Sequence, residues 1–330
     1  VVNCAREETL EAIKNADVAI PLMTHLGRRE LAEASRLKLI LQFGVGLERV
    51  DISAATERGV WVSNVPSQFT GNARSCAEHA MYLALACLRD GRAMEDAVRQ
   101  GRVGQPAGRT LFGRTALVLG FGGIAQELIP RLHAFGAEVI CLRRGEWSDS
   151  SENAAESSLP SASAPSSLFH HALSLSSLRR TEALARSLLS EDARGVWGRD
   201  MRLFAGRADV VFVAVAETPA TRGLVDRSFV QALKPGAVLV NVSRGGLLDR
   251  LAIAEGLESS QIGGLGLDVF WEEPLNVEDP VAAHPRTILT PHVAGVTDHS
   301  YTTMAAYVAD QVLRCRSGLE PLRTVVASGS

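Results

Sequence analysis

A short apolar run that leads directly into a glycine-rich turn constrains this chain more than any other feature. The apolar run covers residues 115–119, and the turn reads Gly-Phe-Gly-Gly-Ile-Ala over residues 120–125. A segment with helical periodicity follows as far as Phe135, and a second apolar run covers residues 138–142. Short apolar runs bounded by turn signals are typical of buried parallel strands. The stretch therefore predicts a strand, a glycine loop, a helix and a second strand in succession.

The spacing of small residues in this loop is typical of a dinucleotide site. Gly120 permits a tight turn, Gly122 lets the backbone approach a pyrophosphate, and the small Ala125 allows the helix to pack closely on the strand. The helix start also offers unpaired N–H groups and a positive dipole end to phosphates. Because the loop lies between two predicted strands, we interpret it as a Rossmann-type site rather than an ordinary glycine turn. The cofactor contacts predicted in the loop are Gly120, Gly122, Gly123 and Ile124.

Two features depart from the usual form of this unit. The second strand usually ends in an acidic residue that binds the ribose 2′-hydroxyl, but Arg143 and Arg144 occupy that place. Two cations suit a 2′-phosphate, so the sequence favours NADP(H), with NAD(H) as the alternative. The alternative is that both arginines are only solvent-exposed cations at the end of a strand. Pro130 lies inside the predicted helix, where it is expected to bend the helix or to cost about 3 kcal/mol.

The rest of the chain predicts two α/β domains. A doubly wound parallel sheet needs alternating strands and helices, and the larger domain, residues 90–296, shows this alternation. A smaller domain is expected from both chain ends, residues 1–89 and 297–330, with long helices at 72–89 and 297–314. The strands of the larger domain are predicted at residues 115–119, 138–142, 209–215, 237–242, 263–269 and 287–290.

Two segments interrupt the alternation. Residues 90–109 contain several glycines, a proline and several arginines, and we interpret them as a crossing between the domains. Twelve of the thirty residues from Ser148 to Ser177 are serine. Because such a composition cannot build a packed core, residues 146–178 are expected to form an insertion. A surface loop is the favoured interpretation, and a cover over the adenosine end of the cofactor is the alternative.

Composition argues against several classes of protein. The formal charge of −3 lacks the basic excess expected of a nucleic-acid-binding protein. No apolar run reaches the roughly 18 residues that a membrane-spanning helix needs. The five cysteines are scattered, with no CxxC pair and no metal-ligand spacing, which predicts a reduced, intracellular, soluble protein without a metal site. No targeting segment is visible after Val1.

Three polar residues are candidates for chemistry. Arg244, Glu273 and His292 each follow the end of a predicted strand, and ligands bind at the carboxyl ends of strands in open α/β sheets. An arginine can bind a carboxylate bidentately, and a histidine exchanges a proton near neutral pH. A carboxylate beside the histidine favours the protonated ring and orients it. Each residue alone is more often a surface or loop residue, but beside a dinucleotide loop the three together predict one active site.

These motifs resemble the D-isomer-specific 2-hydroxyacid dehydrogenases. The resemblance runs from Leu37 to about Arg314, apart from the serine-rich insertion. Within that family, the chain is most similar to the phosphoglycerate-dehydrogenase-like branch, including plant-type members. The most specific segments are Leu117–Ala125, Asn241–Asp249, Gly264–Pro274 and Thr290–Gly295, with a looser match over Phe43–Asp51.

The resemblance implies a Rossmann cofactor domain and a smaller flavodoxin-like substrate domain, with substrate in the cleft between them. It implies that Arg244, Glu273 and His292 are catalytic, and that Arg244 binds the substrate together with Val45 and Gly46. It further implies hydride transfer between NAD(P)H and a 2-oxo acid or D-2-hydroxy acid, in a homodimer joined through the cofactor domain. The other cofactor contacts that it implies are Thr218, Val242, Ser243 and Asp268, the last facing the nicotinamide carboxamide.

The sequence leaves the substrate open. Hydroxypyruvate, glyoxylate and phosphoglycerate-derived oxo acids are the candidates, and pocket walls near Ser67–Asn72 and around Trp271 are expected to choose among them. The alternative function is a cofactor-sensing interaction protein, because corepressors of the C-terminal-binding-protein type share the same three residues. Formate dehydrogenase is less favoured, because that relative has glutamine in place of Glu273.

Overall fold

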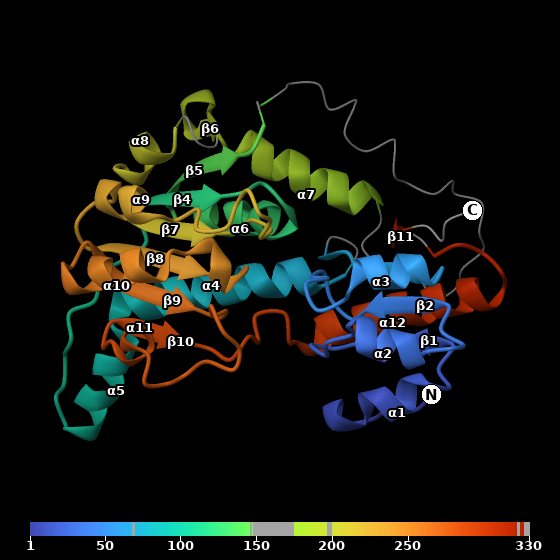
Figure 1. The fold of residues 1–330 in the computed structure, drawn as a ribbon. Coiled ribbons are helices and arrows are strands. Elements are labelled where there is room, and N and C mark those ends of the chain that lie inside the picture. Colours follow the sequence, from blue (N-terminus) through green and yellow to red (C-terminus); the bar gives the residue numbers. More distant parts are fainter. Residues whose placement is uncertain (68–69, 146, 148–174, 197–199, 322–323, 327–330) are drawn as a thin grey trace. The chain divides into compact units, whose positions relative to one another are not determined.

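The computed structural model describes residues 1–67, 70–145, 147, 175–196, 200–321 and 324–326 (Figure 1). Residues 148–174, most of the serine-rich insertion, lie outside the described part. The chain divides into two compact units. The small unit contains Val1–Asn72 and Asp298–Ser330, and the large unit contains Ala73–Asp149 and Ser176–Thr297. The first boundary therefore lies at residue 72, whereas the sequence predicts residue 89.

Among the described residues, the large unit contains a parallel sheet of seven strands in the order β10-β9-β8-β7-β4-β5-β6. The chain runs outward from β4 in both directions, which confirms the predicted doubly wound Rossmann sheet. The sequence predicts all of these strands except β6, which has only three residues. The strands are β4 (Thr115–Leu119), β5 (Glu138–Arg143), β6 (Arg194–Val196), β7 (Val210–Val213), β8 (Ala237–Asn241), β9 (Ile262–Leu267) and β10 (Thr287–Leu289).

Helices connect these strands, and one of them corrects the sequence analysis. The described helices are α4 (Asn72–Arg89), α5 (Gly91–Arg99), α6 (Gly123–Ala134), α7 (Leu175–Ser187), α8 (Met201–Ala205), α9 (Arg227–Ala232), α10 (Arg250–Glu258) and α11 (Pro280–Ala283), with 3₁₀ turns at Glu191–Ala193 and Gly245–Leu247. Helix α5 lies inside the segment predicted as an irregular crossing, and the Asp90 carboxylate accepts from the Ala93 N–H at its start. Helix α6 continues through Pro130, next to the buried Leu128 and Ile129, and the bend or energetic cost expected at this proline stays a prediction.

Two apolar cores form in the large unit because side chains alternate between the two faces of each strand. Val118 and Phe212 belong to one core, and their neighbours Leu117 and Val211 belong to the other. Helices α4 and α6 pack into the first core, and α9 and α10 pack into the second. Since α4 buries its apolar side against the large sheet, it belongs to the large unit, and the boundary falls before it.

The small unit has its own sheet, in the order β1-β2-β3-β11. Its first three strands are parallel, and the C-terminal strand pairs antiparallel with β3. The elements are α1 (Thr9–Ile13), β1 (Val18–Ala19), α2 (Arg28–Glu33), β2 (Leu39–Gln42), α3 (Ile52–Glu57), β3 (Trp61–Asn64), α12 (Asp298–Arg316) and β11 (Thr324–Val326), with a 3₁₀ turn at Arg6–Glu8. Strand β11 was not predicted.

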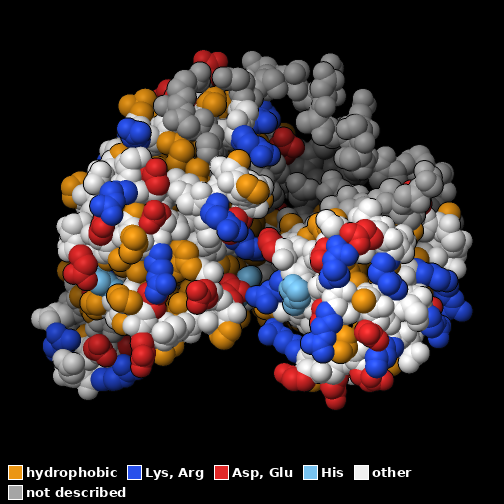
Figure 2. Space-filling view, viewed as in Figure 1, with side chains coloured by type: hydrophobic (Ala, Val, Ile, Leu, Met, Phe, Trp, Pro, Cys, Tyr) orange, Lys and Arg blue, Asp and Glu red, His pale blue; other side chains and the backbone are white. Residues whose placement is uncertain are grey.

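The described surface carries charges of both signs. Figure 2 shows basic and acidic side chains interspersed on the visible face. In the described part of the chain, no helix combines the length and the hydrophobicity needed to cross a bilayer. Within the same residues, no cluster of three or more histidine, cysteine or acidic side chains could hold a metal ion.

Candidate active site

The glycine loop joins β4 to α6 and follows from the demands of close backbone packing. Gly120 has a φ of +105°, and a Cβ atom there would lie 2.4 Å from the carbonyl oxygen of Ala214. Only glycine tolerates both conditions. Gly122 precedes the first turn of α6, and a Cβ at this position would meet no heavy atom within 4 Å. Ala125 is fully buried, as close packing of helix on strand requires. The loop therefore has the room and the helix terminus that a pyrophosphate needs.

His292 and Glu273 are in direct contact. The Nδ1 atom of His292 lies 2.9 and 3.0 Å from the two carboxylate oxygens of Glu273. Glu273 also accepts a 3.3 Å hydrogen bond from the Phe270 N–H, which orients its carboxylate. The two side chains are 29% and 22% exposed, so the pair is partly screened from water yet remains accessible. This pairing leaves the Nε2 atom of the imidazole to exchange a proton with a ligand.

Asp268 holds the loop that carries His292. Its carboxylate is fully buried and accepts three hydrogen bonds, from the Thr290 hydroxyl at 2.7 Å and from the N–H groups of Val293 and Ala294, each at 2.9 Å. His292 itself has a φ of +56°, a left-handed conformation that costs a non-glycine residue about 1–3 kcal/mol. The hydrogen bonds on both sides of His292 stabilise that conformation. A contact of Asp268 with the nicotinamide carboxamide stays a prediction.

Arg244 follows β8 in a turn that its neighbours define. The Asn241 side chain donates to the carbonyl of Arg244 at 2.8 Å and accepts from the Ser243 N–H at 3.0 Å. A Cβ atom on Gly245 would lie 2.0 Å from the carbonyl carbon of Phe270, so only glycine lets this turn approach the segment after β9. The Arg244 side chain is half-buried and donates to the Ser243 carbonyl at 2.7 Å.

The three predicted catalytic residues follow the neighbouring strands β8, β9 and β10. The thiol of Cys76, which is buried on α4, interacts with two of the charged groups at this edge. Burial raises the pKa of Cys76 to about 12, the Asp268 carboxylate adds to the increase, and the Arg244 guanidinium opposes it. The structure brings Glu273 and His292 into contact and positions Arg244 at the same edge of the sheet.

The remaining predicted cofactor positions also follow strand ends. Gly123 and Ile124 form the first turn of α6, Arg143 ends β5 and is half-buried, and Arg144 is exposed. The other members of this group are Thr218, whose N–H donates to Thr221 Oγ1 at 2.8 Å, Val242, which is buried, and Ser243, whose hydroxyl donates to the Val213 carbonyl at 3.1 Å. Their contacts with a cofactor stay predictions.

The predicted substrate residues of the small unit lie in the loop after β2. Val45 is exposed, and its carbonyl accepts a 2.6 Å hydrogen bond from the Asn64 side chain, which holds the loop beside Gly46. Residues 68–69 of the predicted pocket wall lie outside the described part. Trp271 of the large unit donates its indole N–H to the Leu248 carbonyl at 2.7 Å and packs against the second core.

A family model described as "D-isomer specific 2-hydroxyacid dehydrogenase, NAD binding domain" matches residues 81–177 and 179–294, more than half of the chain. The chain belongs to this family. The model covers the glycine loop and all three predicted catalytic residues. It identifies the large unit as an NAD(P)-binding domain of a 2-hydroxyacid dehydrogenase.

The chain is also similar to individual members of the 2-hydroxyacid dehydrogenase family. It is 32% identical over 316 residues to the D-3-phosphoglycerate dehydrogenase of Mycobacterium tuberculosis, covering 95% of this chain and 52% of that protein. It is 28% identical over 326 residues to the glyoxylate reductase of Pyrococcus furiosus, covering 96% of this chain and 84% of that protein. The crystal structure of a glyoxylate reductase from Paecilomyes thermophila aligns with a TM-score of 0.72 at 26% identity, over 97% of this chain and 88% of that chain.

The chain spans about half the length of the phosphoglycerate dehydrogenases that it matches. These matches fit the broad family placement, but they give no support to a plant-type member. They also do not choose between NAD and NADP.

Sequence analysis missed His79, which extends the Asp268 network in this member of the 2-hydroxyacid dehydrogenase family. Its Nε2 atom lies 2.8 Å from the Thr290 hydroxyl and 3.5 Å from the Asp268 carboxylate. Since that hydroxyl donates to Asp268, it accepts from His79, which assigns the hydrogen to Nε2 of the neutral ring. Burial lowers the pKa of His79 below its ordinary value of 6.5, although Asp268 partly opposes this. A single histidine on a predicted helix gave no signal of this role.

The lowered pKa of His79 predicts a pH-dependent loss of stability. Below pH 6.5 the unfolded chain binds a proton at His79 before the folded chain does, so the free energy of unfolding falls as pH decreases toward the folded-state pKa. We expect His79→Gln, which keeps a donor for Thr290, to show a shallower decline between pH 7.5 and 5.5 in urea unfolding. The exposed His133 on α6 supplies the matched control, His133→Gln. Parallel curves for wild type and His79→Gln would contradict this assignment.

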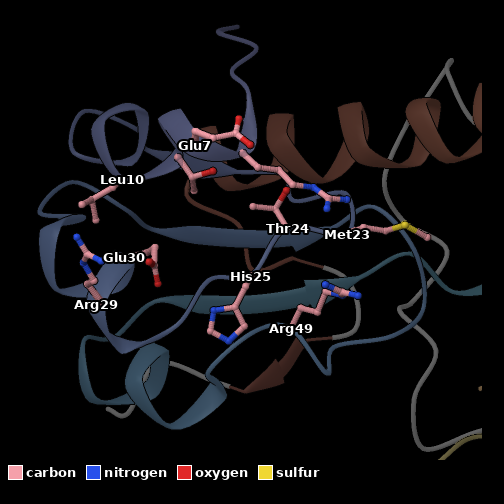
Figure 3. A pocket seen from close by; sticks show the side chains of 10 residues that line it. Glu7, Leu10, Met23, Thr24, His25, Arg29, Glu30 and Arg49 are labelled. Atoms are coloured by element: carbon pink, nitrogen blue, oxygen red, sulfur yellow. The ribbon is translucent and has the colours of Figure 1, made fainter. Parts of the chain in front are cut away.

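A hollow of about 430 Å³ lies in the small unit and contains none of the predicted site residues (Figure 3). Its charged lining consists of Arg6, Glu7, Arg29, Glu30 and Arg49, and His25 also lines it. Glu30 already accepts the Gly27 N–H at 2.9 Å as part of the start of α2. The hollow therefore adds no group to the three predicted catalytic residues.

Proposed function

We propose that this chain is an NAD(P)H-dependent oxidoreductase that interconverts 2-oxo acids and D-2-hydroxy acids. The observation that supports it most is the pairing of the His292 imidazole with the Glu273 carboxylate at 2.9 Å. This pair follows β9 and β10 of the sheet in which the glycine loop follows β4. A histidine held in this way by a carboxylate is suited to proton transfer at neutral pH.

The chemistry divides between the cofactor and the protein. With its pyrophosphate held at the glycine loop, NAD(P)H would supply the hydride for the carbonyl carbon of the 2-oxo acid. Protonated His292 donates its Nε2 proton to the carbonyl oxygen as that oxygen gains negative charge. The ring that remains is neutral, and its Nδ1–H group stays hydrogen-bonded to the Glu273 carboxylate. The Arg244 guanidinium binds the substrate carboxylate and polarises the carbonyl. The reverse reaction uses neutral His292 as the base.

NADP(H) is the cofactor that we favour. The second strand of the dinucleotide unit ends at Arg143 and is followed by Arg144, where an acid would bind the ribose 2′-hydroxyl of NAD. A guanidinium pairs well with a phosphate dianion and gives no advantage with a neutral hydroxyl. The substrates that we propose to test first are hydroxypyruvate, glyoxylate and 3-phosphohydroxypyruvate. A homodimer, as the resemblance implies, is part of the proposal and is testable by light scattering.

The test is the oxidation of NADPH and NADH against a panel of 2-oxo acids, with both cofactors offered to each acid. We expect turnover with at least one of the three acids and a higher kcat/KM with NADPH. An equal kcat/KM with NADPH and NADH would contradict only the preference for NADP(H), and not the proposed reaction. Tight cofactor binding without turnover of any acid would contradict the dehydrogenase and favour the cofactor-sensing interaction protein.

A further inference from the structure

Three arginines converge on one indole ring at the edge of the large sheet. The guanidinium carbon atoms of Arg143, Arg186 and Arg194 lie 5.3, 5.6 and 5.8 Å from the centre of the Trp147 ring. They come from three different elements, the end of β5, the end of α7 and the start of β6. Sequence analysis singled out only Arg143 among these four residues, because Arg186 and Arg194 are far from the dinucleotide unit along the chain and Trp147 matches no motif.

This cluster lies beside the glycine loop. Phe121, the residue between the first two glycines of the loop, contacts Trp147 edge to face with ring centres 5.0 Å apart. Arg186 also lies over the Phe121 ring, at 5.7 Å. The cluster therefore lies next to the pyrophosphate loop, which follows β4, the strand that pairs with β5.

Hydrogen bonds from side chains to backbone carbonyls hold the cluster in place. The Trp147 indole N–H donates to the Gly195 carbonyl at 3.0 Å. Arg194 donates to the carbonyls of Leu189 and Arg186 at 3.1 and 3.2 Å, which ties the start of β6 to the end of α7. A guanidinium that is already stacked on an aromatic ring and held by carbonyls loses less side-chain entropy when it binds an anion.

The cluster concentrates positive charge. Because each guanidinium lies within 6 Å of one point, any two are at most about 12 Å apart, on the order of a Debye length, so their fields add at the Trp147 ring. Glu182 lies 3.4 Å from Arg186, but this pair is partly exposed on both sides and such pairs are weak. A phosphate dianion is the group that gains most from three converging guanidinium groups.

We propose that Arg186 and Arg194 complete, with Arg143, a site for the 2′-phosphate of an adenosine nucleotide, framed by Trp147. This inference deepens the proposed function and rests on its assignment of the glycine loop to the pyrophosphate. It extends the binding site to two arginines that follow the serine-rich insertion. Three guanidinium groups then share the dianion, and the aromatic pair of Phe121 and Trp147 lies beside the adenosine.

The test compares two nucleotides that differ only in the phosphate of interest. Adenosine 2′,5′-bisphosphate and 5′-AMP are titrated into the protein by calorimetry, which requires no turnover. We expect the wild-type protein to bind the bisphosphate at least about tenfold more tightly than 5′-AMP, because one hydrogen bond to a charged group contributes a factor of about that size. Arg186→Gln and Arg194→Gln should each lower the affinity for the bisphosphate about tenfold and leave the affinity for 5′-AMP unchanged.

A matched control uses an arginine in the same kind of contact elsewhere. Arg207 lies 5.3 Å over the Phe204 ring in the large unit, and Arg207→Gln should change neither affinity. Equal binding of the two nucleotides by wild type, no binding of either, or an equal loss for both in the variants would each overturn the phosphate site. Arg194→Lys, which keeps the charge, should retain part of the preference and checks that the loss is not misfolding. Discrimination without turnover of any 2-oxo acid would instead contradict the proposed reaction and leave this site standing.

Discussion

Replacing His292 with asparagine is expected to lower kcat for 2-oxo acid reduction by about 10²- to 10⁴-fold, because general acid catalysis contributes a factor of that size. Asparagine is chosen because His292 has a φ of +56°, and asparagine tolerates the left-handed region better than alanine does. The loop held by Asp268 should therefore keep its conformation in the variant. Only the proton donor is lost.

Two measurements accompany that variant. Cofactor affinity, followed by quenching of tryptophan fluorescence, should stay close to the wild-type value, because His292 lies after β10 and the glycine loop lies after β4. His133→Asn, on the exposed side of α6, should have wild-type kinetics. A His292→Asn enzyme that turns over at a near-normal rate would show that the proton comes from another group.

Replacing Arg244 with lysine is expected to lower kcat/KM by about 10- to 100-fold, mainly through a higher KM for the 2-oxo acid. The hydrogen bonds of a guanidinium to a carboxylate contribute about 1.5–3 kcal/mol each, and lysine keeps the charge but loses the planar fork. Arg244→Met should lose more than Arg244→Lys, because it also removes the charge. The backbone should not change, since Asn241 and Gly245 define the turn without the Arg244 side chain.

The control for the two Arg244 variants is Arg222→Lys. Arg222 is exposed and pairs with Glu217 at 2.8 Å, so its replacement should leave the kinetics unchanged. The two Arg244 variants should also keep the cofactor affinity of the wild type. An unchanged KM in Arg244→Met would mean that the substrate carboxylate is bound elsewhere.

Much of the large unit could be predicted because its signals are local. The strands β4, β5 and β7 to β10 are short apolar runs followed by turn residues, and their predicted bounds agree with the structure to within a few residues. Helix α4 was predicted at residues 72–89 and ends at Arg89, but the sequence analysis assigned it to the smaller domain, whereas nearly all of it lies in the large unit. That assignment depends on which sheet its apolar side covers, which periodicity alone does not tell.

The candidate site likewise contains residues that the sequence indicates and contacts that it does not. The polar residues after strand ends, Arg244, Glu273 and His292, were predictable, because parallel strands bring their carboxyl ends to one edge whatever the connections. The hydrogen bond from His79 to Thr290 joins residues 211 positions apart, and no local pattern indicates it. The contact of Trp147 with Arg194 is also invisible to a local pattern, because it depends on the pairing of β6 with β5, which are separated in the sequence by the serine-rich segment.

Local chemistry along this chain was enough to predict the glycine loop, the doubly wound sheet and the three polar residues at its edge. Tertiary packing alone established the support of the His292 loop by Asp268 and the convergence of three arginines on Trp147. The difference is physical. Turn geometry and strand alternation act between near neighbours, whereas these contacts form only after distant elements have been packed together by the burial of their apolar sides.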